Sequence, residues 1–316
     1  MNLVGWLVAG PFMYLAITVF VGAAAWKIFK IARLPRHLRW DLYPIAHEGK
    51  AGSMYQEVDY WKKPRHFSLV HEILEMAEEI ILLKRTFLYN RKIWRFSFPM
   101  HFAFYLVCGW IGLLILGVLY ETITGIKISP ASSLAVPILL NYLTLFCGGA
   151  GLLIGLFGTV GLLLTRLTDE DLADFSAPVT FLNLAFIGLL FGVGLLYWLM
   201  VDPAFALARD YVGALLLLHP MTEYHPLMVL EIFLFGLFLI YLPFSRMLHF
   251  AAKYFFYHSI MWDDELVARG SALEKEISQH LADRIDWEGP HIVPGSSWAE
   301  QATTNPTRPA AGGEKA

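Results

Sequence analysis

Two histidines lie at the edges of long apolar segments, where an ionisable side chain is costly and marks a candidate functional site. The chain has eleven histidines, and most of the others fall in polar stretches. His101 stands near the start of one apolar segment and His249 at the end of another. If both segments cross a membrane in opposite directions, the two imidazoles lie at one depth. That arrangement suits the axial ligands of a b-type haem; the alternative is that each ring forms hydrogen bonds within a helix bundle.

Cationic and aromatic residues surround both histidines. Arg246 precedes His249 by one helical turn, and Lys92 and Arg95 precede His101. At that depth the cations are predicted to pair with haem propionates, although long cationic side chains also reach the surface at any membrane edge. The rings near His101 are equally compatible with lipid contact and core packing: Phe96, Phe98, Phe102, Phe104 and Tyr105.

A single carboxyl group stands inside the last apolar segment. Glu231 precedes His249 by 18 residues, which is five turns of an α-helix, so the two are predicted to share a face. Facing a cavity opposite Ile111 and near Trp110, a buried carboxyl could carry protons or bind a quinone head group. The alternative is a structural glutamate that forms hydrogen bonds near the membrane surface.

The composition predicts that membrane helices hold these residues. Hydrophobic residues make up 57% of the chain and charged residues only 16%, against about 25% charged in soluble domains. Five apolar segments reach the length of about 20 residues that a helix needs to cross a bilayer. We therefore predict an all-α integral membrane bundle of five helices, over residues 3–26, 97–120, 134–164, 177–201 and 226–249. Cys108 and Cys147 form no CxxC pair, so no iron–sulfur, zinc or c-type haem site is expected.

The positive charges predict the topology. Of the 24 Lys and Arg residues, 22 fall on one side of this arrangement and two, Lys127 and Arg209, on the other. Because basic loops stay in the cytoplasm, the amino terminus is predicted to lie outside and the carboxyl terminus inside. The first segment has no basic residues before it, which indicates an uncleaved anchor rather than a signal peptide.

The polar segments divide the chain into a membrane domain, residues 1–255, and a cytoplasmic tail, residues 256–316. Within the domain, residues 27–96 form a long inner loop that starts irregularly at 39–44. An amphipathic helix is predicted over 66–90, where Val70, Ile73, Leu74, Ile80 and Ile81 recur at helical spacing. Further helices are predicted over 204–218 on the outer side and 263–285 in the tail, whose last residues have the composition of disordered segments.

The sequence around the two histidines resembles a known family. The run Pro-Phe-Ser-Arg-Met-Leu-His at 243–249 is similar to the end of the last helix of respiratory nitrate reductase gamma subunits. Phe-Pro-Met-His-Phe at 98–102 falls where the second helix of that family begins with a histidine. The long loop and tail more closely resemble the cytochrome b subunits of Tmc-, Hmc- and Dsr-type redox complexes of sulfate reducers.

The resemblance implies b haem, menaquinone chemistry, a bacterial inner membrane location and a cytoplasmic iron–sulfur partner similar to heterodisulfide reductase. The gamma subunits also hold an outer haem, whose ligands would fall at Ile111 and Glu231 in this chain. Neither is a histidine, so that haem is not predicted in the family's form. His225, together with His219 or a residue of a partner, is the remaining candidate for a second haem.

From the sequence we expect a membrane cytochrome b subunit with b haem on His101 and His249. It would pass electrons between menaquinone, or a periplasmic multihaem cytochrome c, and cytoplasmic iron–sulfur subunits. Other membrane subunits are possible partners, and nothing indicates nucleic acid. One alternative is a haem-free anchor for soluble redox subunits. A transporter is a weaker alternative, because the sequence has no inverted repeat and no pair of interrupted helices.

Overall fold

The computed structural model describes residues 3–34, 45–46, 58–59, 62–64, 67–262, 268–289 and 292–303. Within those ranges the chain is helical and has no strand, only two isolated bridges in the tail. Five helices are long and apolar enough to cross a membrane, which confirms the predicted all-α membrane architecture. Their bounds are Leu3–Ala32, Arg91–Thr124, Ala135–Thr168, Pro178–Met200 and Pro226–Phe244.

Most of the five spans extend beyond the predicted ends. The first is built from α1 (Leu3–Leu7), a π-helical turn η1 (Val8–Phe12) around Pro11, and α2 (Met13–Ala32). The second, α5 (Arg91–Thr124), and the third, α6 (Ala135–Thr168), continue past the apolar core into polar residues. The fourth is α8 (Pro178–Met200), close to its predicted range.

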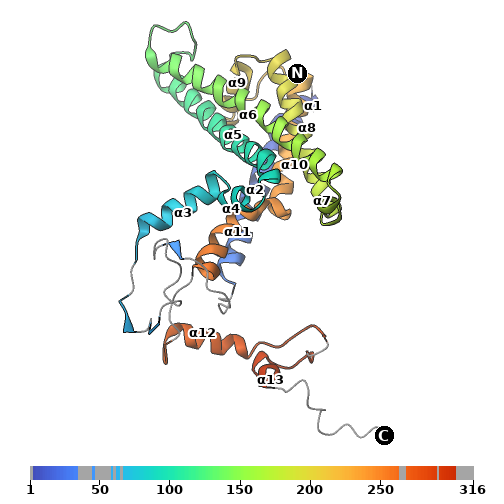
Figure 1. Cartoon of the computed structure of the whole chain (residues 1–316). Helices are drawn as coiled ribbons and strands as arrows, with labels where there is room; N and C mark the ends of the chain where they lie inside the picture. Colours follow the sequence, from blue (N-terminus) through green and yellow to red (C-terminus); the bar gives the residue numbers. More distant parts are fainter. Residues whose placement is uncertain are drawn as a thin grey trace. The chain divides into compact units, whose positions relative to one another are not determined.

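The chain divides into two compact units. The first unit contains Met1–Trp26 and Glu72–Leu248, and therefore the bundle of spans. In this unit α5 packs on α6, α6 on α8, and α8 on α10 (Pro226–Tyr241), which in turn packs on η1 (Figure 1). The second unit contains Lys27–His71 and His249–Ala316.

Small residues on α6 allow α5 to approach it closely. Gly151 faces Val107, and Gly158 lies directly against the backbone of α5. A Cβ atom at Gly158 would be 2.5 Å from the backbone nitrogen of Met100 and 2.8 Å from the carbonyl oxygen of Phe96. In lipid the hydrophobic effect does not drive helices together, so close van der Waals packing of this kind holds them in contact.

Aromatic and aliphatic side chains fill the interior on the other side of α5. Ala103 of α5 is fully buried in a cluster with Phe191 of α8 and Phe238 of α10. The ring of Phe104 stacks on Phe238 with centroids 6.1 Å apart. This cluster brings the second, fourth and fifth spans together one turn away from His101.

The fifth span differs from the prediction at its end. The α-helix stops at Tyr241 and is followed by a 3₁₀ turn, η5 (Leu242–Phe244), that contains Pro243. Ser245 is extended, with φ −100° and ψ 175°, and its hydroxyl accepts a hydrogen bond from the backbone N–H of Met247. A second 3₁₀ turn, η6 (Arg246–Leu248), and then α11 (His249–Phe256) follow.

The prediction that Glu231 and His249 share one helical face is therefore wrong. Pro243 has no N–H to continue the helical hydrogen bonds, and the extended backbone of Ser245 interrupts the helix. Five regular turns do not connect the two residues. His249 begins a new helix instead of ending the fifth span.

The predicted helix over 66–90 is two helices. They are α3 (Leu69–Ile81) and α4 (Lys84–Tyr89), separated where Leu83 has a left-handed backbone with φ 52°. The helix predicted over 204–218 is confirmed as α9 (Ala206–Leu216), and a short helix, α7 (Glu170–Asp174), lies between α6 and α8.

The tail helix predicted over 263–285 is shorter, since α12 spans only Ala272–Leu281. A π-helical turn, η7 (Tyr257–Met261), precedes it, and α13 (Trp298–Thr303), which was not predicted, follows it. The predictions for residues 39–44, for the start of the tail helix at 263–267 and for the last residues of the tail lie outside the described residues.

Adding a side chain at Gly158 is expected to loosen the contact between α5 and α6. Gly158→Ala places a methyl group against backbone atoms that cannot rotate away, at a cost of about 1–3 kcal/mol. The measurement is the thermal unfolding midpoint of the purified protein in detergent, which should fall by several degrees. Gly109→Ala is the matched control, because nothing lies within 4 Å of its Cβ position. Equal midpoints for the two variants would contradict the packing described for α6.

Candidate functional site

The ring of His101 has a fixed orientation in α5. Its Nδ1 lies 2.7 Å from the backbone carbonyl oxygen of Ser97, and the Ser97 hydroxyl lies 3.4 Å away. A carbonyl oxygen only accepts hydrogen bonds, so Nδ1 carries the proton and donates it. The acceptor nitrogen of the ring is then Nε2. Histidines that bind metals usually donate their other ring N–H to a carbonyl or carboxylate in this way.

The aromatic rings near His101 lie in different surroundings. Trp94, Phe98 and Phe102 recur every four residues and stack on one another, with centroids 4.9 Å and 5.8 Å apart. Phe96 points the other way, onto Gly161 and Phe157 of α6. Phe104 belongs to the core cluster described above. The aromatic row therefore covers one side of α5, along the turns before and after His101.

The predicted cations near His101 have different surroundings. Lys92 forms an ion pair with Asp169, the residue that caps α7. This hydrogen-bonded ion pair holds the pKa of Asp169 below its usual range. Arg95 is exposed on α5, between Lys92 and His101. Among the described residues no carboxylate forms an ion pair with Arg95, so of these two cations it is the better candidate to bind an anionic group.

His249 and Arg246 lie on either side of the boundary between the two units. Arg246 belongs to η6 in the first unit, and His249 is the first residue of α11 in the second. Both side chains are exposed in this structure. The pairing of His101 with His249 stays a prediction. The described residues contain no cluster of three or more His, Cys, Asp or Glu side chains that could hold a metal ion. A bis-histidine haem needs only two protein ligands, so this finding does not test it.

Glu231 is a buried carboxyl within α10. Its Oε1 would lie 3.1 Å from a Cβ atom at Gly194 of α8, so the absence of a side chain there makes room for it. Its Oε2 is buried and has no hydrogen-bond partner among the described residues. The group was predicted to face Ile111 and Trp110 of the second span. It lies against the fourth span instead, in apolar surroundings that include Leu152.

Aromatic rings occupy the region around Trp110. The ring of Phe205, only 1% exposed, packs edge-on against Trp110 and stacks on Trp198, with centroids 5.1 Å and 5.8 Å apart. A Cβ atom at Gly148 would be 2.4 Å from Phe205, so the glycine is needed for this packing. The indole N–H of Trp110 is buried without a hydrogen-bond acceptor among the described residues. Trp198 and Phe205 were not singled out from the sequence.

A buried ion pair, which was not predicted from the sequence, joins α9 to α5. The side chain of Arg209 is 6% exposed, and its Nη1 lies 3.9 Å from Oε1 of Glu121. Burial lowers the pKa of Arg209, and the charge of Glu121 opposes that effect. Gly117 provides the space, since a Cβ atom there would be 3.1 Å from Nε of Arg209. Glu121 also accepts hydrogen bonds from Lys127 and from the backbone N–H of Ile128.

The two histidines proposed for a second haem have local backbone roles. His225 caps α10, where its Nδ1 accepts a hydrogen bond from the backbone N–H of Leu227 at 3.2 Å. His219 follows α9, and its backbone N–H donates to the carbonyl of Ala214 at 3.0 Å. These contacts explain both residues as helix-end structure and leave the second haem a prediction.

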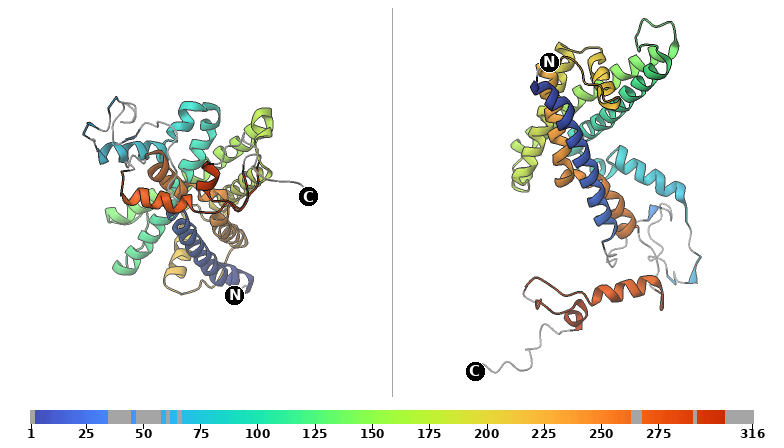
Figure 2. Two further views of the ribbon diagram at one scale, coloured as in Figure 1. Left: turned by 90° about the horizontal axis from the view of Figure 1, so that it is seen from below. Right: turned by 180° about the vertical axis from the view of Figure 1, so that it is seen from behind.

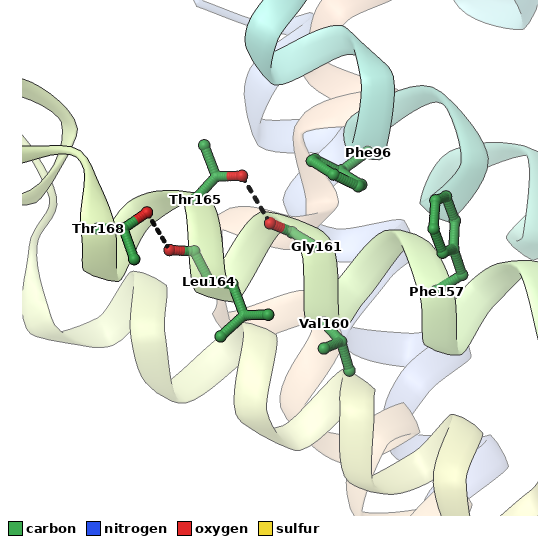
Figure 3. Close-up of a pocket in the computed structure, with 7 residues that line it drawn as sticks. All are labelled: Phe96, Phe157, Val160, Gly161, Leu164, Thr165 and Thr168. Carbon is green, nitrogen blue, oxygen red and sulfur yellow. Dashed lines mark hydrogen bonds between the residues drawn. The ribbon is translucent and has the colours of Figure 1, made fainter.

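A pocket of 380 Å³ lies between α5 and α6, at the same end of the bundle as His101. Figure 3 shows Phe96 and Phe157 on one side and Val160, Gly161 and Leu164 along α6. The hydroxyls of Thr165 and Thr168 donate to carbonyls of their own helix, at 2.7 Å and 2.9 Å. The pocket therefore offers hydrocarbon surface and few polar partners, and it fits an acyl or isoprenoid chain better than a polar group.

Comparisons with protein families and with curated sequences give no relative of this chain. No protein-family model matches the chain, and no curated protein sequence matches it significantly. What the chain does must therefore be argued from its own residues.

Breaking the buried pair from one side is expected to destabilise the bundle. Glu121→Gln removes the carboxylate that pairs with the buried Arg209 cation, and a buried pair that loses one partner costs about 3–5 kcal/mol. The double variant Glu121→Gln with Arg209→Met removes both charges and should recover much of the loss. Thermal unfolding of the three proteins in detergent measures this. If the double variant is no more stable than Glu121→Gln alone, Arg209 does not carry a buried charge that needs Glu121.

Proposed function

We propose that this chain is the membrane cytochrome b subunit of a respiratory redox complex. In this proposal His101 and His249 hold b haem. The chain conducts electrons between menaquinone, or a periplasmic multihaem cytochrome c, and a cytoplasmic iron–sulfur subunit of the heterodisulfide reductase type. The observation that carries the proposal is the ring of His101, held within a membrane span with Nδ1–H on a carbonyl and Nε2 as the acceptor nitrogen.

The residues around His101 fit a haem ligand. Hydrogen bonding of Nδ1–H to the Ser97 carbonyl fixes the tautomer and the ring plane, and it makes Nε2 more basic. When bound, the haem would supply a one-electron carrier, and the protein supplies ligation, burial and charge. Arg95 on α5 and Arg246 on η6 are the cations that would compensate its propionates.

The proposed orientation follows from the charge distribution. With 22 of 24 basic residues on one side, the His101 end of the bundle faces the cytoplasm and the amino terminus faces the periplasm. This places the ligands next to the inner loop and the tail, where an iron–sulfur subunit would dock. The resemblance to the gamma subunits supports the inner membrane of a bacterium as the location.

Glu231 is the candidate for proton transfer in this scheme. Oxidation of a quinol releases two electrons and two protons, and the protons need an acceptor. A carboxyl with a buried, unpartnered oxygen can take up a proton without first breaking a hydrogen bond to the protein. Glu231 lies on the half of α10 nearer α9, so it would serve a quinone on the periplasmic side.

The second candidate function is a haem-free membrane anchor that only holds soluble redox subunits. It is favoured by the exposed position of His249 at the start of a separate helix. A transporter is not supported by any feature of the described residues.

Haem content distinguishes the two functions. We expect about one b haem per chain, and its loss in His101→Ala and in His249→Ala, since each removes one axial ligand. The pyridine hemochrome assay of the purified variants measures this. His258→Ala is the control: its Nδ1 contacts the carbonyl of Tyr254 at 2.8 Å, as His101 contacts that of Ser97, but it lies outside the five spans. Full haem retention in both ligand variants would rule out the assignment.

Replacing Glu231 tests the proton role separately. Glu231→Gln keeps the size of the side chain and removes its ability to titrate. Reduction of the haem by a menaquinol analogue should slow at least tenfold in this variant and lose its dependence on pH, while haem content stays unchanged. Glu170→Gln, in the exposed α7, is the control. Unchanged rates for Glu231→Gln over the whole pH range would show that the carboxyl is only structural.

A further inference from the structure

One helix of the bundle's unit leaves its apolar side uncovered. From Glu72 onward, α3 belongs to the same unit as the spans. Its aliphatic side chains are open, with exposed fractions of 58% for Ile73, 55% for Leu74 and 49% for Ile81. The other side of the helix is acidic, with Glu72 in the first turn and Glu75 after it. A helix with one aliphatic and one charged side can lie at the boundary between membrane and water, where the charged side is most often basic.

Two hydrogen bonds attach the end of α3 to a membrane-spanning helix. The hydroxyl of Tyr105 donates to the carbonyl of Ile80 at 2.6 Å, and the indole N–H of Trp94 donates to the carbonyl of Leu82 at 2.8 Å. Trp94 lies near the start of α5, and Tyr105 lies about 21 Å along the helix axis from its first residue, Arg91. Both side chains thus hold the last turn of α3 alongside the first half of a span.

The Trp94 contact lies before the apolar segment predicted over 97–120, where a membrane surface is expected, and the Tyr105 contact lies deeper along α5. Trp and Tyr are enriched where a helix leaves the hydrocarbon for the head groups, because their rings are apolar and their N–H or O–H is polar. The two donors satisfy carbonyls at the end of α3 that would otherwise have no partner within the helix. The end of α3 is therefore placed at the bilayer boundary rather than in bulk water.

One cation on the polar side of the α3–α4 segment pairs with two of its carboxylates. Lys84, the first residue of α4, lies 2.6 Å from a carboxylate oxygen of Glu75 and 2.8 Å from one of Glu78. Glu79 turns inward and accepts a hydrogen bond from the backbone N–H of Arg85. These contacts gather the charged groups on one side and keep them away from the aliphatic side. Figures 1 and 2 show α3 extending sideways from the spans instead of packing along them.

We propose that α3 is an in-plane interfacial helix, whose aliphatic side inserts among the lipids at the membrane surface. The occupant of this side is the acyl and head-group boundary of the bilayer. A protein partner is a poorer fit, because binding energy between proteins is concentrated in Trp, Tyr and Arg side chains, and the exposed apolar residues of α3 are all aliphatic. The proposal does not depend on haem or on electron transfer.

Spin labels on single cysteines test this in the full chain. The two native cysteines are first replaced, as Cys108→Ala and Cys147→Ala, and labels are then attached at Ile73→Cys or Glu72→Cys. The protein is reconstituted into vesicles of phosphatidylcholine and phosphatidylglycerol. Oxygen concentrates in lipid and a nickel chelate in water, so the ratio of the two collision rates reports the surroundings of each label. Leu116→Cys, an exposed position in the second half of α5 and within the predicted apolar segment, calibrates the value for lipid.

The expected result is an oxygen-to-nickel ratio at Ile73→Cys at least fivefold higher than at Glu72→Cys, and close to that at Leu116→Cys. Nickel-dominated collisions at both α3 positions would place the helix in water and overturn the proposal. So would a label at Ile73→Cys that is immobile and shielded from both reagents, because that side would then be covered by protein.

The tether is tested in the same system. Tyr105→Phe removes the hydroxyl that donates to Ile80, so a label at Ile81→Cys should become more mobile and lose depth in the bilayer. Tyr142→Phe, at an exposed position on α6, is the matched control and should change neither. Equal effects of the two tyrosine variants would show that the hydrogen bond does not hold α3 at the membrane.

Discussion

The close approach of α5 and α6 is the contact on which the rest of the bundle depends. In lipid, helices gain nothing from burying apolar surface, so they stay together only where backbones come near enough for dense packing. Gly158 provides such a place, since the backbone of Met100 fills the position of its missing side chain. Met100 is the neighbour of His101, so the same contact sets where the imidazole lies. A bulkier residue at Gly158 would shift the ligand helix itself.

The buried polar groups of the bundle have a cost that its packing must offset. Glu231 and Arg209 each keep polar atoms without hydrogen-bond partners among the described residues, and each lies beside a glycine, Gly194 and Gly117. A glycine at such a position accommodates a long polar side chain that a larger residue would displace. Unsatisfied groups of this kind cost about 1–3 kcal/mol or more. Retaining them inside a membrane bundle favours a role beyond packing, which for Glu231 is the proposed proton transfer.

Much of the fold could be predicted from the sequence, because hydropathy and helix length act locally. The five spans follow from their apolar residues alone, and α9 follows from a short amphipathic stretch. What failed depended on single backbone positions. Leu83 divides the predicted loop helix by adopting a left-handed conformation, and Ser245 ends the fifth span by becoming extended. A hydropathy profile detects neither of these backbone conformations, although a proline such as Pro243 favours the end of a helix.

The site could be predicted only in part. His101 was found because an ionisable residue inside a span is conspicuous, but its tautomer depends on the Ser97 carbonyl one turn earlier. Glu231 was predicted to be a buried carboxyl, and its Oε2 is buried, but its contact with Gly194 on the fourth span was not predicted. Arg209 and Phe205 were missed because their burial arises from tertiary packing of α9 on α5.

A spectrum of the purified full chain tests the central claim most directly. If His101 holds haem together with a second imidazole, the dithionite-reduced protein must show the α-band of a b-type cytochrome. The oxidised protein must give the electron paramagnetic resonance signal of low-spin ferric haem. Both signals should amount to about one haem per polypeptide and disappear in His101→Ala. A protein that is folded in detergent, expressed with ample haem, and still without either signal would contradict the account and leave the chain a haem-free anchor.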